Sequence, residues 1–431
     1  MDILLRILNF LITDIFGVAS IFMALIALVG LLLLKKSFSD VITGVFKTAL
    51  GVIILQQGVG VLVNSMLPLA GSIGALQQAT PFPGDMIGSD QFMNEYGMQI
   101  GIAMLVGFII NLLVARFTRW KAVFLTGHML YWFPFVFTAV AVSAGFKGWT
   151  AGLIGGLFAA VYYVVSPNLI RPYIREVTGD DSFTLGHPSV SLALVGGFLA
   201  KKFGNKEKST EDVDFPKGLK FLKEVGITGS IVVMLTYLVV YIAFLVTGAE
   251  VAIDTGGVSM FQFILTSGLM FGAGLTILML GVRMLIAEIT TAFTGIQEKL
   301  IPDAIPAYDC PLLFPYAPNA VILGFIVSMV TSVVFIFITG SLSIFKYAVI
   351  PVVITCFFEC GTASVVGNAM GGRRGAMIAS VTSGILLVFL MGFSLPFVEN
   401  TVADWMLGNA GQDFSLWAII EGLILKIFTG A

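Results

Sequence analysis

The sequence predicts an all-α polytopic membrane protein. Of its 431 residues, 58% are hydrophobic and only 11% are charged, and the mean hydropathy is +1.00. A soluble domain would carry roughly a quarter of charged residues. Apolar runs long enough to span a bilayer recur from one end of the chain to the other. The net charge of −2 argues against nucleic acid as a partner.

The apolar runs predict about eleven transmembrane helices. The first is too long for a signal peptide and has no small-residue cleavage site after it, so we expect it to be retained. The last is short and contains Glu421, so it is either a tilted crossing or an interfacial helix. In order, the runs cover roughly 10–34, 41–67, 97–115, 122–144, 148–166, 227–247, 260–282, 312–339, 341–358, 375–398 and 414–428.

The charges between these runs predict the orientation. Basic residues gather in one set of alternate loops and acidic residues in the other, with Lys147 and Lys346 as exceptions. The positive-inside rule then predicts an outside N-terminus and a cytoplasmic C-terminus. The expected inner residues are Lys35, Lys36, Arg116, Arg119, Lys121, Arg171, Arg175, Arg283, Lys299, Arg373, Arg374 and Lys426, and the expected outer ones are Asp85, Asp90, Glu95, Glu250, Asp254, Glu399, Asp404 and Asp413.

Three stretches depart from the pattern of simple crossings. The long polar connection 201–224 mixes seven lysines with five acids and is either a solvated loop or a docking face for a cytosolic partner. The apolar half of 171–201 is too short to cross and return, so a re-entrant hairpin is predicted there. The Gly-rich stretch 359–375 is predicted to form a second such hairpin. Paired interruptions of this kind point to the substrate site of a transporter.

The segment 302–318 is the first candidate for a site. It holds five prolines, with the carboxylate of Asp309 at its centre, and proline prevents a regular helix. Broken backbone at membrane depth is tolerated only when it is buried in protein or lines a wet cavity, and an acidic group there indicates function. The other interpretation is a cytoplasmic loop that re-enters a helix, with Asp309 as its cap.

The two histidines of the chain share one setting. His128 and His187 each follow a glycine beside a membrane segment, which fits either a structural residue or a site residue. A shift of 181 residues places His128 on Asp309 and 186–187 on 367–368. This faint repeat suggests two structural repeats with the site where the halves meet.

The cysteines give no sign of a cofactor. Cys310, Cys356 and Cys360 form neither a metal-ligand pattern nor a disulfide framework. We therefore expect no metal and no cofactor, and no phosphorylated residue within this chain.

Several motifs resemble the ascorbate-type enzyme IIC permeases of the bacterial sugar phosphotransferase system, also called UlaA or SgaT. They are FLTGHML, LGHPSVSLALVGGFLAKKFGN, and GVRMLIAEITTAFTGIQEKLIPDAIPAYDCPLLFPYAPNAVILGF. The resemblance implies an inner-membrane homodimer that moves ascorbate or a related sugar by an elevator mechanism. Cytosolic IIA and IIB components would supply the phosphoryl group.

The resemblance also implies domains and site residues. V-motif helices would cover 10–67 and 227–300, the mobile core 97–200 and 301–398, and a C-terminal helix 414–428. The residues that match the family's polar positions around the sugar are Gln56, His128, His187 and Asp309, with Asn319, Asn368 and Glu288 as further candidates.

Three positions depart from the family pattern. Pro188 and Trp132 stand where amide side chains are expected, and Val59 replaces a small polar residue. These changes trade hydrogen-bonding groups for apolar surface, so a neutral sugar or polyol is predicted to bind at least as well as ascorbate. The alternative is that Trp132 faces lipid and Pro188 only stiffens the hairpin.

Two other functions fit the same residues. One is an ion-coupled secondary transporter in which Asp309 or Glu288 carries the proton. The other is a receptor or scaffold with a vestigial pocket. A phosphorylated product separates the permease from the secondary transporter, and specific uptake excludes the scaffold.

Overall fold

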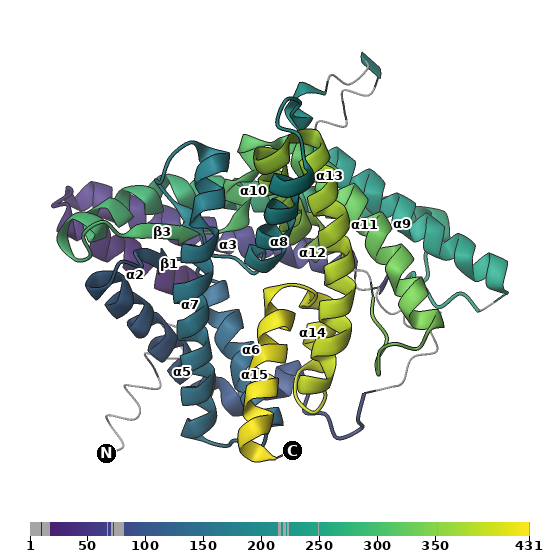
Figure 1. The fold of residues 1–431 in the computed structure, drawn as a ribbon, viewed down its shortest axis with the longest axis horizontal. Coiled ribbons are helices and arrows are strands. Elements are labelled where there is room, and N and C mark those ends of the chain that lie inside the picture. The colour runs from purple at the N-terminus through teal and green to yellow at the C-terminus, as the bar shows by residue number, and fades with distance from the viewer. Residues whose placement is uncertain are drawn as a thin grey trace.

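The computed structural model describes residues 10, 18–66, 68–69, 72, 82–213, 217–218, 221, 224–248, 250–350 and 352–430. The chain is largely helical, as predicted (Figure 1). The main helices are α2 (Ala19–Leu33), α3 (Phe38–Asn64), α5 (Ser89–Phe117), α6 (Met129–Ser143), α7 (Trp149–Thr178), α8 (Val190–Phe203), α9 (Val225–Thr247), α10 (Met260–Lys299), α11 (Pro318–Ser341), α12 (Val353–Thr355), α13 (Gly361–Ser394), α14 (Ala403–Asn409) and α15 (Asp413–Thr429).

Seven helices in the described part of the chain are long and apolar enough to cross a membrane. They confirm a multi-pass membrane protein but are fewer than the predicted crossings. Helices α6 and α8 have 15 and 14 residues and reach only about 22 Å, which is short of the roughly 30 Å of hydrocarbon. The seven are Phe38–Leu62, Ser89–Phe117, Trp149–Thr178, Gly226–Thr247, Met260–Lys299, Pro318–Ser341 and Val353–Phe397.

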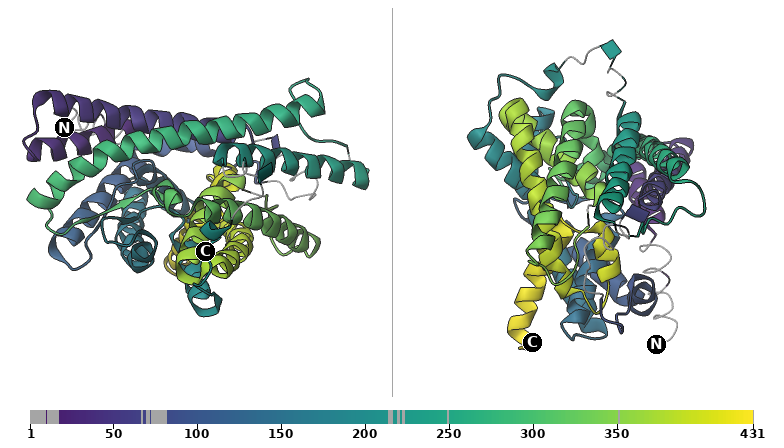
Figure 2. Two further views of the ribbon diagram at one scale, coloured as in Figure 1. Left: turned by 90° about the horizontal axis from the view of Figure 1, so that it is seen from above. Right: turned by 90° about the vertical axis from the view of Figure 1, so that its right-hand side faces the viewer.

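The helices form two groups. Helices α2, α3 and α9 pack along α10, and Figure 2 shows them side by side at one edge of the molecule. Small residues allow this close approach. A Cβ added at Gly281 of α10 would lie 2.3 Å from the backbone nitrogen of Leu55 in α3. The second group contains α5, α6 and α7, together with α8, α11, α13 and α15.

A small parallel sheet departs from the all-α prediction. Strands β1 (Ala122–Phe124), β3 (Ile305–Tyr308) and β2 (Thr184–Leu185) lie in the order β1-β3-β2. The outer edge of β1 is covered by Asn111 of α5, which donates to Ala122 O at 3.0 Å and accepts from Phe124 N at 2.9 Å. This buried amide takes the place of a neighbouring strand, because it pairs backbone groups of β1 that would otherwise lack hydrogen-bond partners.

One predicted crossing is wrong. Most of 341–358 is non-helical: α11 ends at Ser341, and the next helical turn begins at Val353. Within the non-helical stretch, Lys346 and Tyr347 both bind the carboxylate of Glu399, at 2.7 and 2.8 Å. These polar contacts hold the stretch beside the segment that follows α13, so it cannot continue as a helix across the membrane.

The structure brings together two charged residues that the sequence analysis assigned to opposite faces of the membrane. Lys426, expected inside, lies over the ring of Phe397 at 5.3 Å, two residues from Glu399, which was expected outside. In Figures 1 and 2 the C-terminus and the polar loop that follows α8 lie at opposite ends of the molecule. Helix α15 has only 17 residues, and it starts beside the turn that precedes α8, so it does not cross the whole molecule.

The Gly-rich stretch forms a helical hairpin, as predicted: two helical arms meet at a sharp break at Gly371 and Gly372, and a Cβ added at Gly367 on one arm would lie 2.7 Å from the backbone oxygen of Gly375 on the other. Gly372 has φ +61°, and a Cβ there would lie 2.1 Å from the backbone oxygen of Asn205. The loop after α8 packs against this break through two backbone hydrogen bonds. Asn205 N donates to Gly371 O at 2.8 Å, and Arg373 N donates to Lys208 O at 2.6 Å. Only glycine fits such a close backbone approach.

Candidate functional site

The three parallel strands end at the same edge of the sheet, and one polar side chain follows each strand. Asp309 follows β3 directly, whereas His128 and His187 follow β1 and β2 by a short Gly-containing turn. Three segments far apart in sequence thus converge because the carboxyl ends of parallel strands share one edge. The strands themselves are buried, so the polar groups project from an apolar support.

Asp309 lies between the two imidazoles. His187 Nε2 is 3.4 Å from Asp309 Oδ1, and His128 Nε2 is 3.7 Å from Asp309 Oδ2. Both separations exceed the 2.7–3.2 Å of a well-formed N–H···O hydrogen bond. The three side chains therefore retain hydrogen-bonding capacity toward a ligand. His128 is the most accessible, with 20% of its side chain exposed against 5% for His187.

Neighbouring groups fix the orientation of two of these side chains. Asp309 Oδ1 accepts from Cys310 N at 2.7 Å, as the cap of a short 3₁₀ turn, η4 (Cys310–Leu312). His187 Nδ1 lies 3.1 Å from Ser189 Oγ, which leaves Nε2 directed at Asp309. The capping role that the sequence offered as the alternative for Asp309 therefore coexists with the cluster.

A buried carboxylate that the sequence analysis placed outside the membrane supports the His187 turn. Asp413 at the start of α15 accepts hydrogen bonds from the backbone N–H and hydroxyl of Ser191. Its own N–H donates to Pro188 O at 3.0 Å. Tyr162 OH lies 2.6 Å from Asp413 Oδ2 and 2.9 Å from His187 O. The carboxylate thus caps the first turn of α8 and ties the turn to two other helices.

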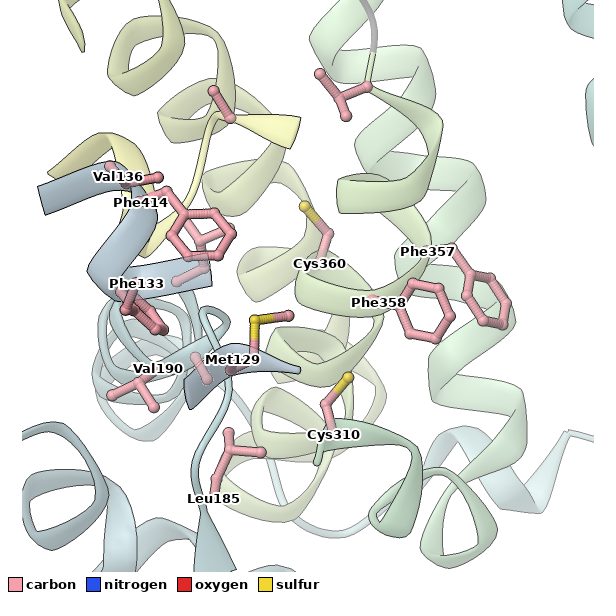
Figure 3. Close-up of a cluster of buried hydrophobic side chains, with 14 of the residues drawn as sticks. Met129, Phe133, Val136, Leu185, Val190, Cys310, Phe357, Phe358, Cys360 and Phe414 are labelled. Atoms are coloured by element: carbon pink, nitrogen blue, oxygen red, sulfur yellow. The ribbon is translucent and has the colours of Figure 1, made fainter. Parts of the chain in front are cut away.

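The cluster opens on a cavity of about 100 Å³. Leu55, Val59 and Leu62 of α3 and Leu278 of α10 form one wall, and the second helix group forms the rest. Figure 3 shows Met129, Phe358 and Phe414 of that second wall within a buried apolar cluster that also includes Cys310 and Cys360. The full lining is Leu55, Val59, Leu62, His128, Met129, Trp132, His187, Leu278, Asp309, Pro311, Ile354, Thr355, Phe358, Glu359, Trp405, Asn409, Gln412 and Phe414.

Four predicted site residues lie elsewhere. Gln56 is exposed on α3 and does not line this cavity, although its neighbour Leu55 does. Glu288 of α10 pairs with Lys47 at 3.1 Å. The structure therefore does not bring either residue to the cluster of His128, His187 and Asp309.

Asn319 and Asn368 bind the loop after α8 instead of the cavity. Asn368 Oδ1 accepts from Thr210 N at 2.9 Å, and Asn319 Nδ2 donates to Thr210 O at 3.2 Å. Glu211 accepts from the backbone N–H groups of Asn319 and Ala320, at 3.3 and 3.1 Å, and so caps α11. These amides hold helices α11 and α13 to one loop.

Sequence reasoning missed several cavity residues. Glu359, Trp405, Asn409 and Gln412 line the cavity but were not among the predicted site residues. Glu359 sits on a π-helical turn, Cys356–Cys360, between α12 and α13. Such turns often occur at functional sites, and a carboxyl group at the end of an apolar run was the one available signal.

The donor set also has the chemistry of a metal site. One ligand atom each from His128, His187 and Asp309 lies within 4.8 Å of the others. Two imidazoles and a carboxylate suit a first-row transition metal. No metal-ligand spacing is visible in the sequence, because the three ligands follow three strands that are far apart in the chain.

Comparison of the sequence with known proteins identifies the family of this chain. The family model described as PTS system sugar-specific permease component, EIIC-GAT, matches residues 14–417. The chain is also 28% identical, over 451 aligned residues, to the protein named "Ascorbate-specific PTS system EIIC component" from Mycoplasma pneumoniae (strain ATCC 29342 / M129 / Subtype 1), covering 93% of this chain and 68% of the relative. The chain belongs to the sugar-specific permease family of the phosphotransferase system.

Proposed function

We propose that this protein carries ascorbate or a related sugar or polyol across the bacterial inner membrane and presents it for phosphorylation by a cytosolic IIB component. A IIA component would recharge IIB. The observation that carries the proposal is the cluster of His128, His187 and Asp309 beside a cavity between two helix groups. The Mycoplasma relative's name specifies ascorbate for that protein.

The chemistry of the cluster suits hydroxyl groups. Imidazole and carboxylate together provide donors and acceptors for a polyhydroxyl solute. A base within hydrogen-bond reach of a hydroxyl also assists its attack on a phosphoryl group. Any of the three side chains meets that chemical requirement.

The position of the cavity supports an elevator mechanism. One wall belongs to α3 and α10 and the other to the second helix group, so sliding one group past the other would move the site across the membrane. In this proposal α2, α3, α9 and α10 are the V-motif domain at the interface of a homodimer. The loop after α8 faces the cytoplasm, and the end of α15 faces the opposite side.

The test is uptake by proteoliposomes that contain the IIA and IIB components and a phosphoryl donor. We expect uptake to require phosphorylated IIB and to deliver a sugar phosphate inside, with no change when an ionophore collapses the ion gradients. Uptake of unmodified sugar that stops with the ionophore would favour an ion-coupled transporter. A chelator arm tests whether the His128–His187–Asp309 cluster uses a metal, and we expect it to leave uptake unchanged.

A further inference from the structure

We propose that Glu359 and the stacked pair Trp132–Trp405 form a second recognition face of the cavity, which selects an uncharged polyhydroxyl solute over an anion such as ascorbate. The inference rests on the proposed function, because it names the substrate class for the same cavity. It goes beyond the cluster of His128, His187 and Asp309 by assigning a role to further residues of the lining.

Outside the cluster of His128, His187 and Asp309, Glu359 is a polar lining group with unused binding capacity. Its side chain is buried, with 4% of the residue exposed. Its Oε2 atom has no hydrogen-bond partner in the described part of the chain. Leaving a buried carboxyl oxygen unpaired costs free energy, so a site that keeps one is suited to a ligand that pairs with it.

The other polar residues that line the cavity outside the cluster already form hydrogen bonds within the protein. Thr355 Oγ1 donates to Ala410 O at 3.1 Å. Asn409 Nδ2 donates to Trp405 O at 2.9 Å, and Gln412 binds both Asn409 O and Phe414 N. These groups fix the backbone around α14 and the start of α15. Glu359 is therefore the residue of this lining that we assign to the ligand.

The charges of the lining disfavour an anion. Among the described residues that line the cavity, the ionisable side chains are two carboxyl groups, Asp309 and Glu359, and two histidines, with no lysine or arginine. An anionic ligand would meet two acidic groups without a permanent cation to pair with. The hydroxyls of a neutral polyol can both donate to and accept from carboxyl groups, so this lining can bind them without a permanent cation.

The two tryptophans supply the apolar surface that a sugar ring needs. Trp132 of α6 and Trp405 of α14 have ring centroids 4.9 Å apart, with planes inclined by 27°. Both rings line the cavity, so Trp132 does not simply face lipid. An aromatic wall packs against the C–H groups of a neutral sugar while polar groups at the edge take its hydroxyls.

The experiment measures binding to the purified full chain in detergent, with ascorbate and a panel of neutral pentoses, hexoses and alditols as probes. The variants are Glu359→Gln and Trp405→Ala. The matched control is Glu421→Gln on α15, because Glu421 is also buried with unpartnered carboxyl oxygens but lies outside the described lining of this cavity.

We expect a neutral member of the panel to bind more tightly than ascorbate. Glu359→Gln and Trp405→Ala should each weaken that binding by about 10-fold or more, with Glu421→Gln within about twofold of wild type. Tighter binding of ascorbate than of every neutral probe, or wild-type affinity in Glu359→Gln with the protein folded, would overturn the inference.

The outcome is separable from that of the proposed function. If IIB-dependent phosphorylation occurs with ascorbate alone, the permease function stands and the substrate class proposed for Glu359 fails. If a neutral sugar binds through Glu359 but is never phosphorylated in the complete system, the recognition face stands and the phosphotransfer proposal fails.

Discussion

Asp309 is the residue on which the candidate site depends, because each of its carboxylate oxygens faces a different imidazole. A single carboxylate thereby lies within 4 Å of both rings, while the hydrogen bond from Cys310 N fixes the carboxylate itself. The loss of any one of the three side chains removes one of the polar groups that the cavity offers to a ligand.

We predict that His128→Ala, His187→Ala and Asp309→Asn each weaken substrate binding by about 10-fold or more. Binding is measured on purified, monodisperse protein, so that a folding defect is detected separately. Glu288→Gln is the control, because Glu288 pairs with Lys47 away from the cavity, and we expect its affinity to stay near that of wild type. Wild-type affinity in all three cluster variants would remove the cluster from the site.

For single residues, the sequence predicted the site only where a polar group was rare in its surroundings. His128, His187 and Asp309 stood out in an apolar chain, and the structure places them together. Asn319 and Asn368 were further candidates, but their partner is Thr210, in a loop whose position depends on tertiary packing. Glu359 was hidden at the end of an apolar run that resembled a simple crossing.

Among the elements, the sheet supports the site, and amide side chains cover its outer edge at β1, where Asn168 Oδ1 also accepts from Ala122 N at 3.4 Å. Asn111 binds both a carbonyl and an N–H of β1. The strands have two to four residues each, too few for a period-two pattern, so the sequence indicated interruptions at these places but not strands. Parallel pairing across 183 positions, from Ala122 to Ile305, has no local sequence signal.

We predict that Asn111→Leu destabilises the protein by about 2–4 kcal/mol, because two buried backbone groups lose their partner. Thermal unfolding in detergent is the measurement, read out by intrinsic fluorescence. Thr236→Val is the control: its hydroxyl binds only the carbonyl of Val232 within α9, so its effect should stay within about 0.5 kcal/mol. Equal stability of Asn111→Leu and the control would show that β1 needs no such edge partner.

For the molecule as a whole, the two helix groups meet at the cavity, and transport by the proposed mechanism requires them to slide. The sequence predicted the class and the interruptions because hydropathy and proline act locally. It assigned Lys426 and Glu399 to opposite faces because Lys426 was counted as a loop charge, whereas Lys426 lies over Phe397, two residues from Glu399. A contact between residues so far apart in sequence is set by packing.

We predict that joining the two groups stops transport. Leu62→Cys on α3 and Ile354→Cys on the opposite wall both line the cavity, and a short bifunctional thiol reagent should link them. Uptake should fall by at least about tenfold and return after reduction of the linker. Each single variant keeps the same buried native cysteines and serves as the control. Full uptake by efficiently linked protein would contradict relative movement of these walls.

The strand order also bears on how the protein is made. Because β3 is the middle strand, β1 and β2 have no strand partner until residue 308 has been synthesised. Asn111 precedes β1 in the chain, so one edge of β1 is covered early, while the edge that faces β3 stays open through the synthesis of about half the protein. An open edge is costly in hydrocarbon, so it must stay hydrated or against the insertion machinery until β3 arrives. A chain that stops before β3 should therefore be a substrate for the proteases that remove incomplete membrane proteins.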